Sequence, residues 1–364
     1  FINSKGVIMK KELLMASALV STLGAASVAQ AVTATMSGSL KIGQEFDSPD
    51  SGSETNTTHD QANFSVSLSE TTDGGTTISS SFMLENESGG VDDDNAIKLT
   101  FSDGSALELL NAGNASGTHA VSVPGAAGEQ GVAGTTTANA PTGLAFGAAS
   151  TALGVEWHSA ADFMMDGLKV SASFSTDDGA ANTATANVDS SWGIGATYVT
   201  TAGDSTVTIG AGVADSESGK TGTEITSERN GMHVGVSAVT GDLTVAVGYA
   251  DGDTVADAGA IGTAGNSPAN TQVDGSVMLA GIKYVSGDIT LAIGATSGEG
   301  KDSTTTGTAG TTDDAHDSVG ASVTYAVASG VSAILGYTSV DIQDEGATSN
   351  TGGSAWYVGA TMSF

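Results

Sequence analysis

The chain has 364 residues, among them 51 glycines and no cysteine, with 5% aromatic residues and a formal net charge of −31. The excess of negative charge excludes nucleic acid as a partner, because no basic patch is present to displace the counterions of a phosphate backbone. The lack of cysteine excludes a disulfide-stabilised scaffold, so the fold must be held by backbone pairing or by a large core.

The N-terminal segment is predicted not to belong to the folded protein. A basic start at Met9-Lys10-Lys11 precedes an apolar run at 13–28, and Ala29-Gln30-Ala31 has the small-x-small pattern of a cleavage site. The apolar run is shorter than the roughly 20 residues of a membrane-spanning helix. We therefore interpret 9–31 as a secretory signal peptide, and 1–8, which precede the first methionine, as upstream read-through.

The mature chain, 32–364, keeps seven Lys and Arg residues against forty Asp and Glu residues, a formal net charge of −33. A surface with so many carboxylates and so little lysine suits contact with salty water or divalent cations. Beyond the leader, no apolar run approaches the length of a membrane-spanning helix. A membrane β-barrel stays open, because its strands are apolar only at every second residue.

Apolar residues alternate with Ser, Thr, Gly or Ala in segments of about ten residues along the mature chain. The first segment, at 33–42, places Met36, Leu40 and Ile42 on one face and Lys41 on the other. This two-residue period predicts β-strands with one apolar face and one small, polar face. The pattern recurs at 168–174, 192–198, 207–213, 243–249 and 289–293.

Two kinds of connector separate these strands. Short connectors contain the Gly and Asp residues that tight turns require, at 72–75, 102–104, 202–204, 240–242, 286–288 and 328–330. Longer polar tracts lie near 47–60, 88–94, 112–151, 177–190, 215–229, 251–273, 298–317 and 342–353. Eight long connectors with short turns between them predict about sixteen strands, with both chain ends on the short-turn side.

The strands are predicted to close into an all-β, antiparallel transmembrane β-barrel with long external loops and short periplasmic turns. Leu, Ile, Val and Phe are too sparse for the core of a sandwich of this size. In a barrel, lipid covers the apolar face, water fills the lumen, and closure leaves no unpaired strand edge. Aromatic residues on the apolar parity are predicted to form interfacial girdles: Trp157, Trp192, Tyr198, Tyr249, Tyr325, Tyr337 and Trp356.

The last ten residues are predicted to be the closing strand. Trp356, Val358, Met362 and Phe364 share the lipid-facing parity, and Tyr357 lies on the opposite parity and faces the lumen. The partner of this strand is the first mature strand at 33–42. A terminal phenylalanine in this position is held by strand pairing, although chain termini usually fray.

The whole mature chain resembles the general diffusion porins of Gram-negative outer membranes, in their Gly- and Asp-rich branch with sixteen strands. The resemblance lies in the leader, in residues 32–43, 64–82 and 247–252, and in Val358-Gly359-Ala360-Thr361-Met362-Ser363-Phe364, taken in this order and spacing. It implies an outer-membrane location, a closing Phe strand read by the barrel-insertion machinery, and homotrimers. It also implies that the third long loop, at 112–151, folds inward and narrows the pore.

Strand parity places most of the basic residues in the lumen, where rings of charge set the ion preference of a pore. Avoidance of lipid alone would also direct lysines inward. The resemblance favours Lys41 and Lys98, because related porins place basic residues on early strands opposite the inward loop. The candidate lumen residues are Lys41, Lys98, Lys169, Arg229 and Lys283 with His158 and His233, together with Glu108, Glu156 and, in the inward loop, Glu129.

The chain departs from the resembled family at the pore. That family sets an arginine cluster against several loop carboxylates, whereas this chain has one arginine and only Glu129 in its third long loop. The field across the pore is therefore expected to be weak. We predict a water-filled channel for small hydrophilic solutes and ions with a weak preference for cations.

Two acidic clusters have the oxygen ligands that calcium prefers: Asp92, Asp93 and Asp94, and Asp313, Asp314 and Asp317. Neither has the glycine and closing glutamate of a dedicated calcium loop, so a solvated acidic loop is the simpler interpretation. Through divalent cations, such clusters are also able to bridge to the phosphates of lipopolysaccharide.

Enzymatic function has no support in the sequence, which contains no zinc-binding His-Glu-x-x-His, no phosphate-binding loop and no Gly-x-Ser-x-Gly elbow. Two alternatives to a general pore remain open. A structural or adhesive surface protein that binds divalent cations would show repeats of fixed length, whereas the strands recur at irregular intervals. A substrate-specific barrel would need an aromatic slide or a cluster of lumen charges.

Overall fold

The computed structural model describes residues 32–85, 91–92, 96–110, 112–130, 132, 142–144, 153–176, 188–218, 227–256, 271–303, 309–343 and 351–364. These residues form one antiparallel sheet of seventeen strand segments and a short helix, α2 (Ala115–Thr118). The segments are β1 (Thr33–Pro49), β2 (Thr55–Thr71), β3 (Thr77–Glu85), β4 (Val91–Asp92), β5 (Ile97–Thr100), β6 (Ala106–Leu109), β7 (Leu153–His158), β8 (Leu168–Thr176), β9 (Val188–Ala202), β10 (Ser205–Ser218), β11 (Ser227–Thr240), β12 (Leu243–Ala256), β13 (Thr271–Ser286), β14 (Ile289–Ser303), β15 (Ala309–Ala328), β16 (Val331–Gln343) and β17 (Thr351–Ser363).

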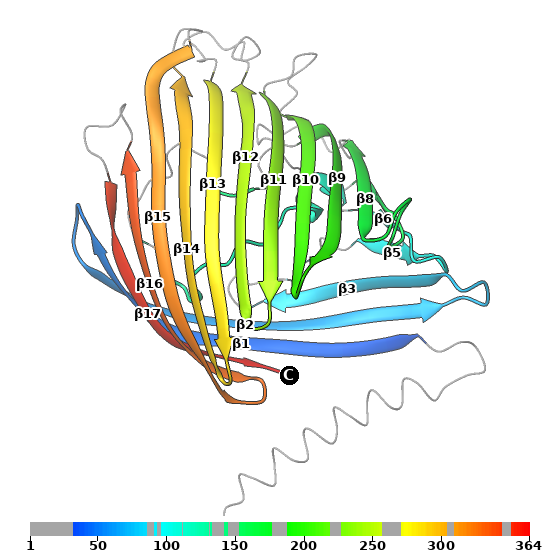
Figure 1. Ribbon diagram of the computed structural model, residues 1–364, viewed down its shortest axis with the longest axis horizontal. Helices are drawn as coiled ribbons and strands as arrows, with labels where there is room; N and C mark the ends of the chain where they lie inside the picture. Colours follow the sequence, from blue (N-terminus) through cyan, green and yellow to red (C-terminus); the bar gives the residue numbers. More distant parts are fainter. Residues whose placement is uncertain are drawn as a thin grey trace, which may run out of the picture.

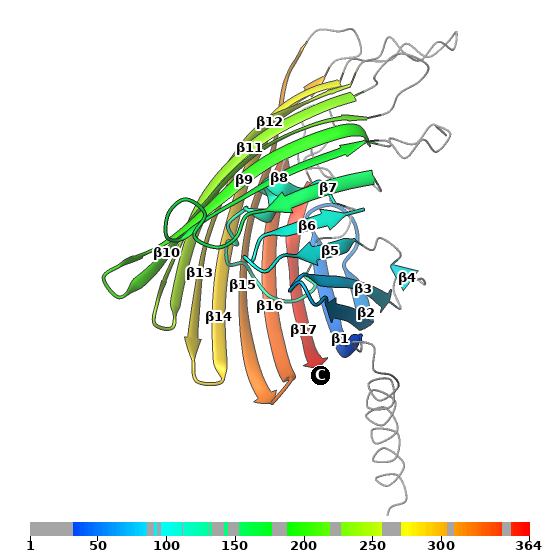
Figure 2. The same cartoon turned by 90° about the vertical axis from the view of Figure 1, so that its right-hand side faces the viewer.

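The sheet closes into the predicted barrel of sixteen strands. β4 and β5 are two pieces of one strand, because both pair with β3. Each further strand pairs with its neighbours in the chain, and β1 pairs with β17 from Ser39 opposite Ser363 to Pro49 opposite Gly353. Figure 1 shows β1 between β2 and β17, and Figure 2 shows the hairpin ends of β9 to β16 at one end of the barrel. Among the described residues, no helix has the length and apolar character to cross a membrane.

The predicted two faces of the strands are present. In β12, Val245, Val247 and Tyr249 are exposed on the outer wall, whereas Ala246 and Ala250 on the inner wall are buried. The same outward exposure recurs on the other strands, so a belt of large apolar side chains surrounds the barrel. A belt of this kind is stable only where lipid covers it.

On the outer wall of three neighbouring strands, aromatic residues lie opposite one another, two of which were predicted for a girdle. Phe46 on β1 lies opposite Trp356 on β17, which lies opposite Tyr337 on β16. The ring centroids of Tyr337 and Trp356 are 4.7 Å apart. Rows of amphipathic rings mark the level at which the lipid tails meet the headgroups.

The strands are longer than the predicted segments of about ten residues, and the prediction of loops around them was wrong in part. β15 has 20 residues and includes Asp313, Asp314 and Asp317, which were assigned to a loop at 298–317. Antiparallel backbone pairing needs no apolar side chains, so the ladder continues beyond the lipid belt through polar residues. Asp92 likewise lies in β4. Asp93, Asp94, the signal peptide and residues 1–8 lie outside the described residues.

The short turns have the predicted chemistry. Glycines adopt positive φ at Gly75, Gly104, Gly203, Gly241 and Gly287, where other residues would be strained. One connection was not predicted as a turn: Ser159–Gly167, between β7 and β8, holds two non-glycine residues, Asp162 and Met164, at φ 59° and 63°.

The seam between β1 and β17 is covered by two aromatic rings that lie over glycines. Phe364 exchanges two backbone hydrogen bonds with Gly38, at 3.1 and 3.2 Å, and its ring occupies the space where a side chain on Gly38 would be. On the inner wall, the ring of Tyr357 lies over Gly43 and Gly359, and its hydroxyl donates to the carbonyl of Ile42 at 3.3 Å. The terminal phenylalanine is therefore held in the sheet, as predicted.

Replacing Tyr357, which is 0% exposed, is expected to weaken the seam. Tyr357→Ala empties the space above Gly43 and Gly359, and loss of a buried aromatic ring costs about 3 kcal/mol. Tyr357→Phe keeps the ring and loses one hydrogen bond, a cost of about 1 kcal/mol. Urea unfolding of the detergent-solubilised barrel measures both. Val358→Ala, on the outer face of the same strand, is the control, and equal stability of all three variants would contradict this account of the seam.

Candidate functional site

The described part of the predicted constriction loop lies inside the barrel, against a belt of glycines on its inner wall. A Cβ on Gly235 of β11 would lie 2.8 Å from the Cβ of Val121, and one on Gly294 of β14 would lie 2.6 Å from the carbonyl oxygen of Pro124. Further glycines underlie the loop: Gly195, Gly210, Gly248, Gly281, Gly320 and Gly336. Because these residues have no side chains, the loop lies flat along the wall from β9 to β16.

Side chains of the wall fix this loop through hydrogen bonds. Ser173 on β8 accepts from the backbone N–H of Ala115 at 3.1 Å and donates to the carbonyl of Gly113 at 2.8 Å. Ser322 on β15 accepts from the N–H of Ala127 at 2.8 Å. The loop is therefore attached to β8, which lies beside the glycine belt, and to β15, which lies within it.

Glu156 on β7 attaches the start of the loop. Its carboxylate accepts from the backbone N–H of Asn114 at 3.0 Å and from the hydroxyl of Thr118 at 2.9 Å. It lies on the inner wall, as the strand parity predicted, but the loop buries it to 3% exposure. A carboxylate covered in this way acts on the loop and has little contact with passing ions.

Two of the predicted lumen lysines have carboxylate partners. The Lys41 ammonium on β1 contacts Glu129 of the loop, which closes the loop onto the barrel seam. Lys98 on β5 lies 2.6 Å from Glu108 on β6, and Glu108 lies 3.3 Å from His158 on β7. The sequence predicted these residues for the lumen, and the structure brings them together in pairs.

The three remaining predicted cations stand apart. Lys169 on β8, Arg229 on β11 and Lys283 on β13 are exposed and have no ion pair within the part of the chain that the structure describes. Lys169 lies opposite Thr197 and Lys283 lies opposite Thr244. These cations are therefore free to act on solutes in the water of the lumen.

A histidine follows α2 and joins the loop to the wall. His119 contacts the hydroxyl of Ser171 through Nε2 at 2.8 Å and that of Thr197 through Nδ1 at 2.6 Å. Ser171 also contacts His158 at 2.9 Å. Burial lowers the pKa of His119 to about 4, with smaller contributions from His158, His233 and Lys169. We therefore expect His119 to be neutral at neutral pH, because burial disfavours the charged imidazolium.

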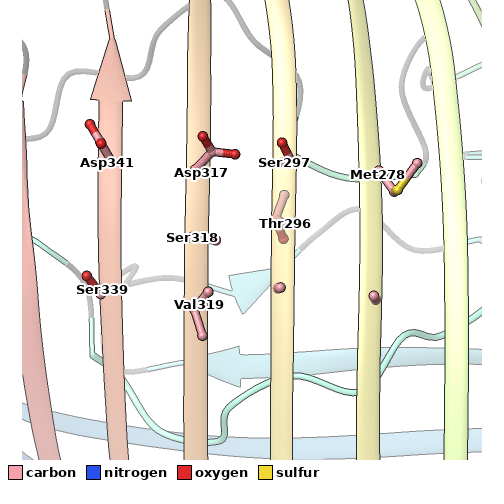
Figure 3. A pocket seen from close by; sticks show the side chains of 10 residues that line it. Met278, Thr296, Ser297, Asp317, Ser318, Val319, Ser339 and Asp341 are labelled. Carbon is pink, nitrogen blue, oxygen red and sulfur yellow. The ribbon is translucent and has the colours of Figure 1, made fainter.

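One hollow lies on the inner wall of the barrel and another lies on the outer wall. A cavity of about 810 Å³ on the inner wall is lined by residues of β5 to β9, of the two turns between them and of the loop. A groove of about 430 Å³ lies on the outer wall, where Figure 3 shows Asp341, Asp317 and Ser297 on neighbouring strands. Asp317 therefore faces away from the pore. Among the described residues, no group of three or more His, Cys, Asp or Glu side chains is arranged to hold a metal ion.

Sequence reasoning missed the parts of the site that depend on the loop. The predicted site residues did not include His119, Ser171 or Asp162. The glycine belt had a signal in the sequence, since glycines recur on the lumen parity near the middle of strand after strand. Their common height becomes visible only through the register, as in the row Gly210, Gly235 and Gly248.

A family model of Gram-negative porins matches residues 16–345 of the chain. The chain therefore belongs to the Gram-negative porin family, and it is a channel protein of the outer membrane that serves diffusion through a water-filled barrel. No curated protein matches the chain at a significant level.

Solved structures have the same fold. The anion-selective porin from Comamonas acidovorans matches with a TM-score of 0.62 at 12% identity, over 92% of this chain and 100% of that chain. The trimer form of OmpT from Vibrio cholerae matches with a TM-score of 0.59 at 15% identity, over 92% and 99%. A further refined porin structure matches with a TM-score of 0.56 at 19% identity, over 91% and 100%. At these identities the likeness concerns the fold alone.

Acid is expected to loosen the loop at His119. Because the pKa of the attached histidine, about 4, lies below its ordinary value of 6.5, the attachment is complete above about pH 6.5 and weakens as the pH falls toward 4. The titratable groups around it are His158, His233 and Lys169, with Glu156 beyond Thr118. Single-channel current noise should therefore rise between pH 7 and pH 4.

The variant His119→Gln separates this effect from other titrations, because glutamine is able to hydrogen-bond to Ser171 and takes up no proton. Its current noise should change little with pH. His59→Gln is the matched control, since His59 contacts Glu45 on the wall at 2.8 Å and is not part of the loop attachment. An acid response that persists in His119→Gln would contradict the assignment.

Proposed function

We propose that the protein is a general diffusion porin that passes small hydrophilic solutes and ions, selects them by size and charge, and weakly prefers cations. We further propose that it assembles as a homotrimer, as the trimer form of its structural neighbour from Vibrio cholerae suggests. Contacts with lipopolysaccharide through divalent cations at its acidic segments, and recognition of the Phe364 strand by insertion machinery, are part of the same proposal. We propose that the protein acts as a channel and does not catalyse a reaction.

The observation that carries the cation preference is the charge of the short turns. The turns that the structure describes carry exposed carboxylates and no Lys or Arg. They are Asp73, Asp103, Asp162, Asp166, Asp204, Asp242 and Asp288. A ring of one sign of charge at a pore mouth raises the local concentration of the opposite ion.

Local pairing explains why the preference should be weak. The charges of Lys41 and Glu129 cancel each other, as do those of Lys98 and Glu108. Lys169 and Lys283, which have no ion pair among the described residues, oppose the turn carboxylates. Salt also screens exposed charges, with a Debye length of about 10 Å at 0.1 M and about 3 Å at 1 M. The preference should therefore be largest in dilute salt.

Planar-bilayer recording tests the proposal. In a gradient of potassium chloride, the reversal potential should have the sign of cation preference and should shrink as both salt concentrations rise. If the protein is a trimer, the current should rise in groups of three equal steps. A reversal potential of the opposite sign would refute the cation preference, and a silent bilayer despite confirmed insertion would refute the pore.

The combined variant Asp204→Asn, Asp242→Asn, Asp288→Asn removes three turn carboxylates and is expected to move the reversal potential toward zero. The matched control is Asp317→Asn with Asp341→Asn, because these two carboxylates face the outer wall. The control should keep the wild-type reversal potential. Equal shifts in both variants would show that overall charge, and not the turn mouth, sets the preference.

A further inference from the structure

The cavity of about 810 Å³ on the inner wall lies at the turn end of the barrel. The turns of β5–β6 and β7–β8 contribute Gly104, Asp162 and Gly167, and the strands contribute Lys98, Glu108 and Lys169. His119 and Thr118 of the loop close it from the other side. The cavity is therefore a side chamber of the lumen, large enough for a solute of several non-hydrogen atoms.

The charges of this chamber divide into a paired set and an unpaired set. Lys98 and Glu108 lie 2.6 Å apart and neutralise each other. Lys169 and Asp162 also line the chamber and are exposed, and neither has an ion pair within the described ranges. One ammonium and one carboxylate thus remain for a ligand.

Asp162 is held in position by its turn. It adopts φ 59°, a left-handed conformation that aspartate tolerates better than most residues. Its Oδ1 accepts from the backbone N–H of Gly167 at 2.6 Å, and Oδ2 has no hydrogen-bond partner among the residues that the structure describes. The carboxylate is therefore oriented before any ligand arrives, and less entropy is lost on binding.

We propose that this chamber is a binding subsite for small zwitterionic solutes of the amino-acid class, with Lys169 receiving the carboxylate and Asp162 receiving the ammonium group. A simple anion would meet repulsion from Asp162, and a simple cation would meet repulsion from Lys169. A solute that carries both charges satisfies both residues. The inference rests on the proposed pore function, because a solute reaches the chamber through the lumen.

The test is the reduction of single-channel potassium current by L-glutamine added to the turn side. The reduction should saturate with concentration. Two relatives of the probe each lack one charge: N-acetyl-L-glutamine keeps the carboxylate and L-glutaminamide keeps the ammonium group. Each should need about tenfold higher concentration for the same reduction, as expected for loss of one charged contact.

Two variants locate the effect on the chamber. Lys169→Gln and Asp162→Asn should each raise the half-maximal glutamine concentration about tenfold. Asparagine keeps the oxygen that accepts from Gly167 and tolerates positive φ, so the turn is preserved. The matched controls are Lys283→Gln, an exposed lysine near the turn end of β13, and Asp166→Asn, in the same turn as Asp162; neither lines the chamber.

Glutamine responses that change in the chamber variants and not in the controls support the subsite. Wild-type channels that open normally and show no saturable response to glutamine overturn it and leave the pore function intact, as do equal shifts in chamber and control variants. A protein that opens no channels contradicts the pore function itself, and the subsite with it.

Discussion

The need to satisfy every backbone N–H and C=O group inside a lipid layer governs this structure. A sheet in lipid has no water at its edges, so its first and last strands must pair with each other. The pairing of β1 with β17 meets this need, and two aromatic residues lie at this seam. Phe364 covers Gly38 from the lipid side and Tyr357 covers Gly43 and Gly359 from the lumen, so the seam is shielded on both faces.

The inner wall has a glycine-rich part, on which the loop lies, and a part that carries charged side chains. From β9 to β16 it is rich in glycine, and the loop lies directly on the backbone, held by hydrogen bonds from Ser173 and Ser322. From β1 to β8 it carries Lys41, Lys98, Glu108 and Lys169, whereas Arg229 and Lys283 lie near the ends of β11 and β13. The small residues of the inner face thus make room for a segment of the chain.

Two of the five candidate Lys and Arg residues of the lumen, Lys41 and Lys98, pair with Glu129 and Glu108. In the proposed pore, the ion preference therefore depends on the exposed turn carboxylates and on the three cations that have no ion pair among the described residues.

The sequence alone determined the barrel, its sixteen strands, the two faces of each strand and the pairing of Phe364 with the first strand. The reason is that these features follow from local patterns: residues alternate between a face toward lipid and a face toward water, and glycines mark the turns. It also placed Lys41, Lys98 and Glu108 in the lumen by parity. Only the tertiary structure decided that Lys41 contacts Glu129, that His119 joins the loop to Ser171, and that Lys169 and Asp162 share a chamber. These contacts join residues whose relative height depends on strand register and on the path of the loop, and neither is encoded in the spacing of residues along the chain.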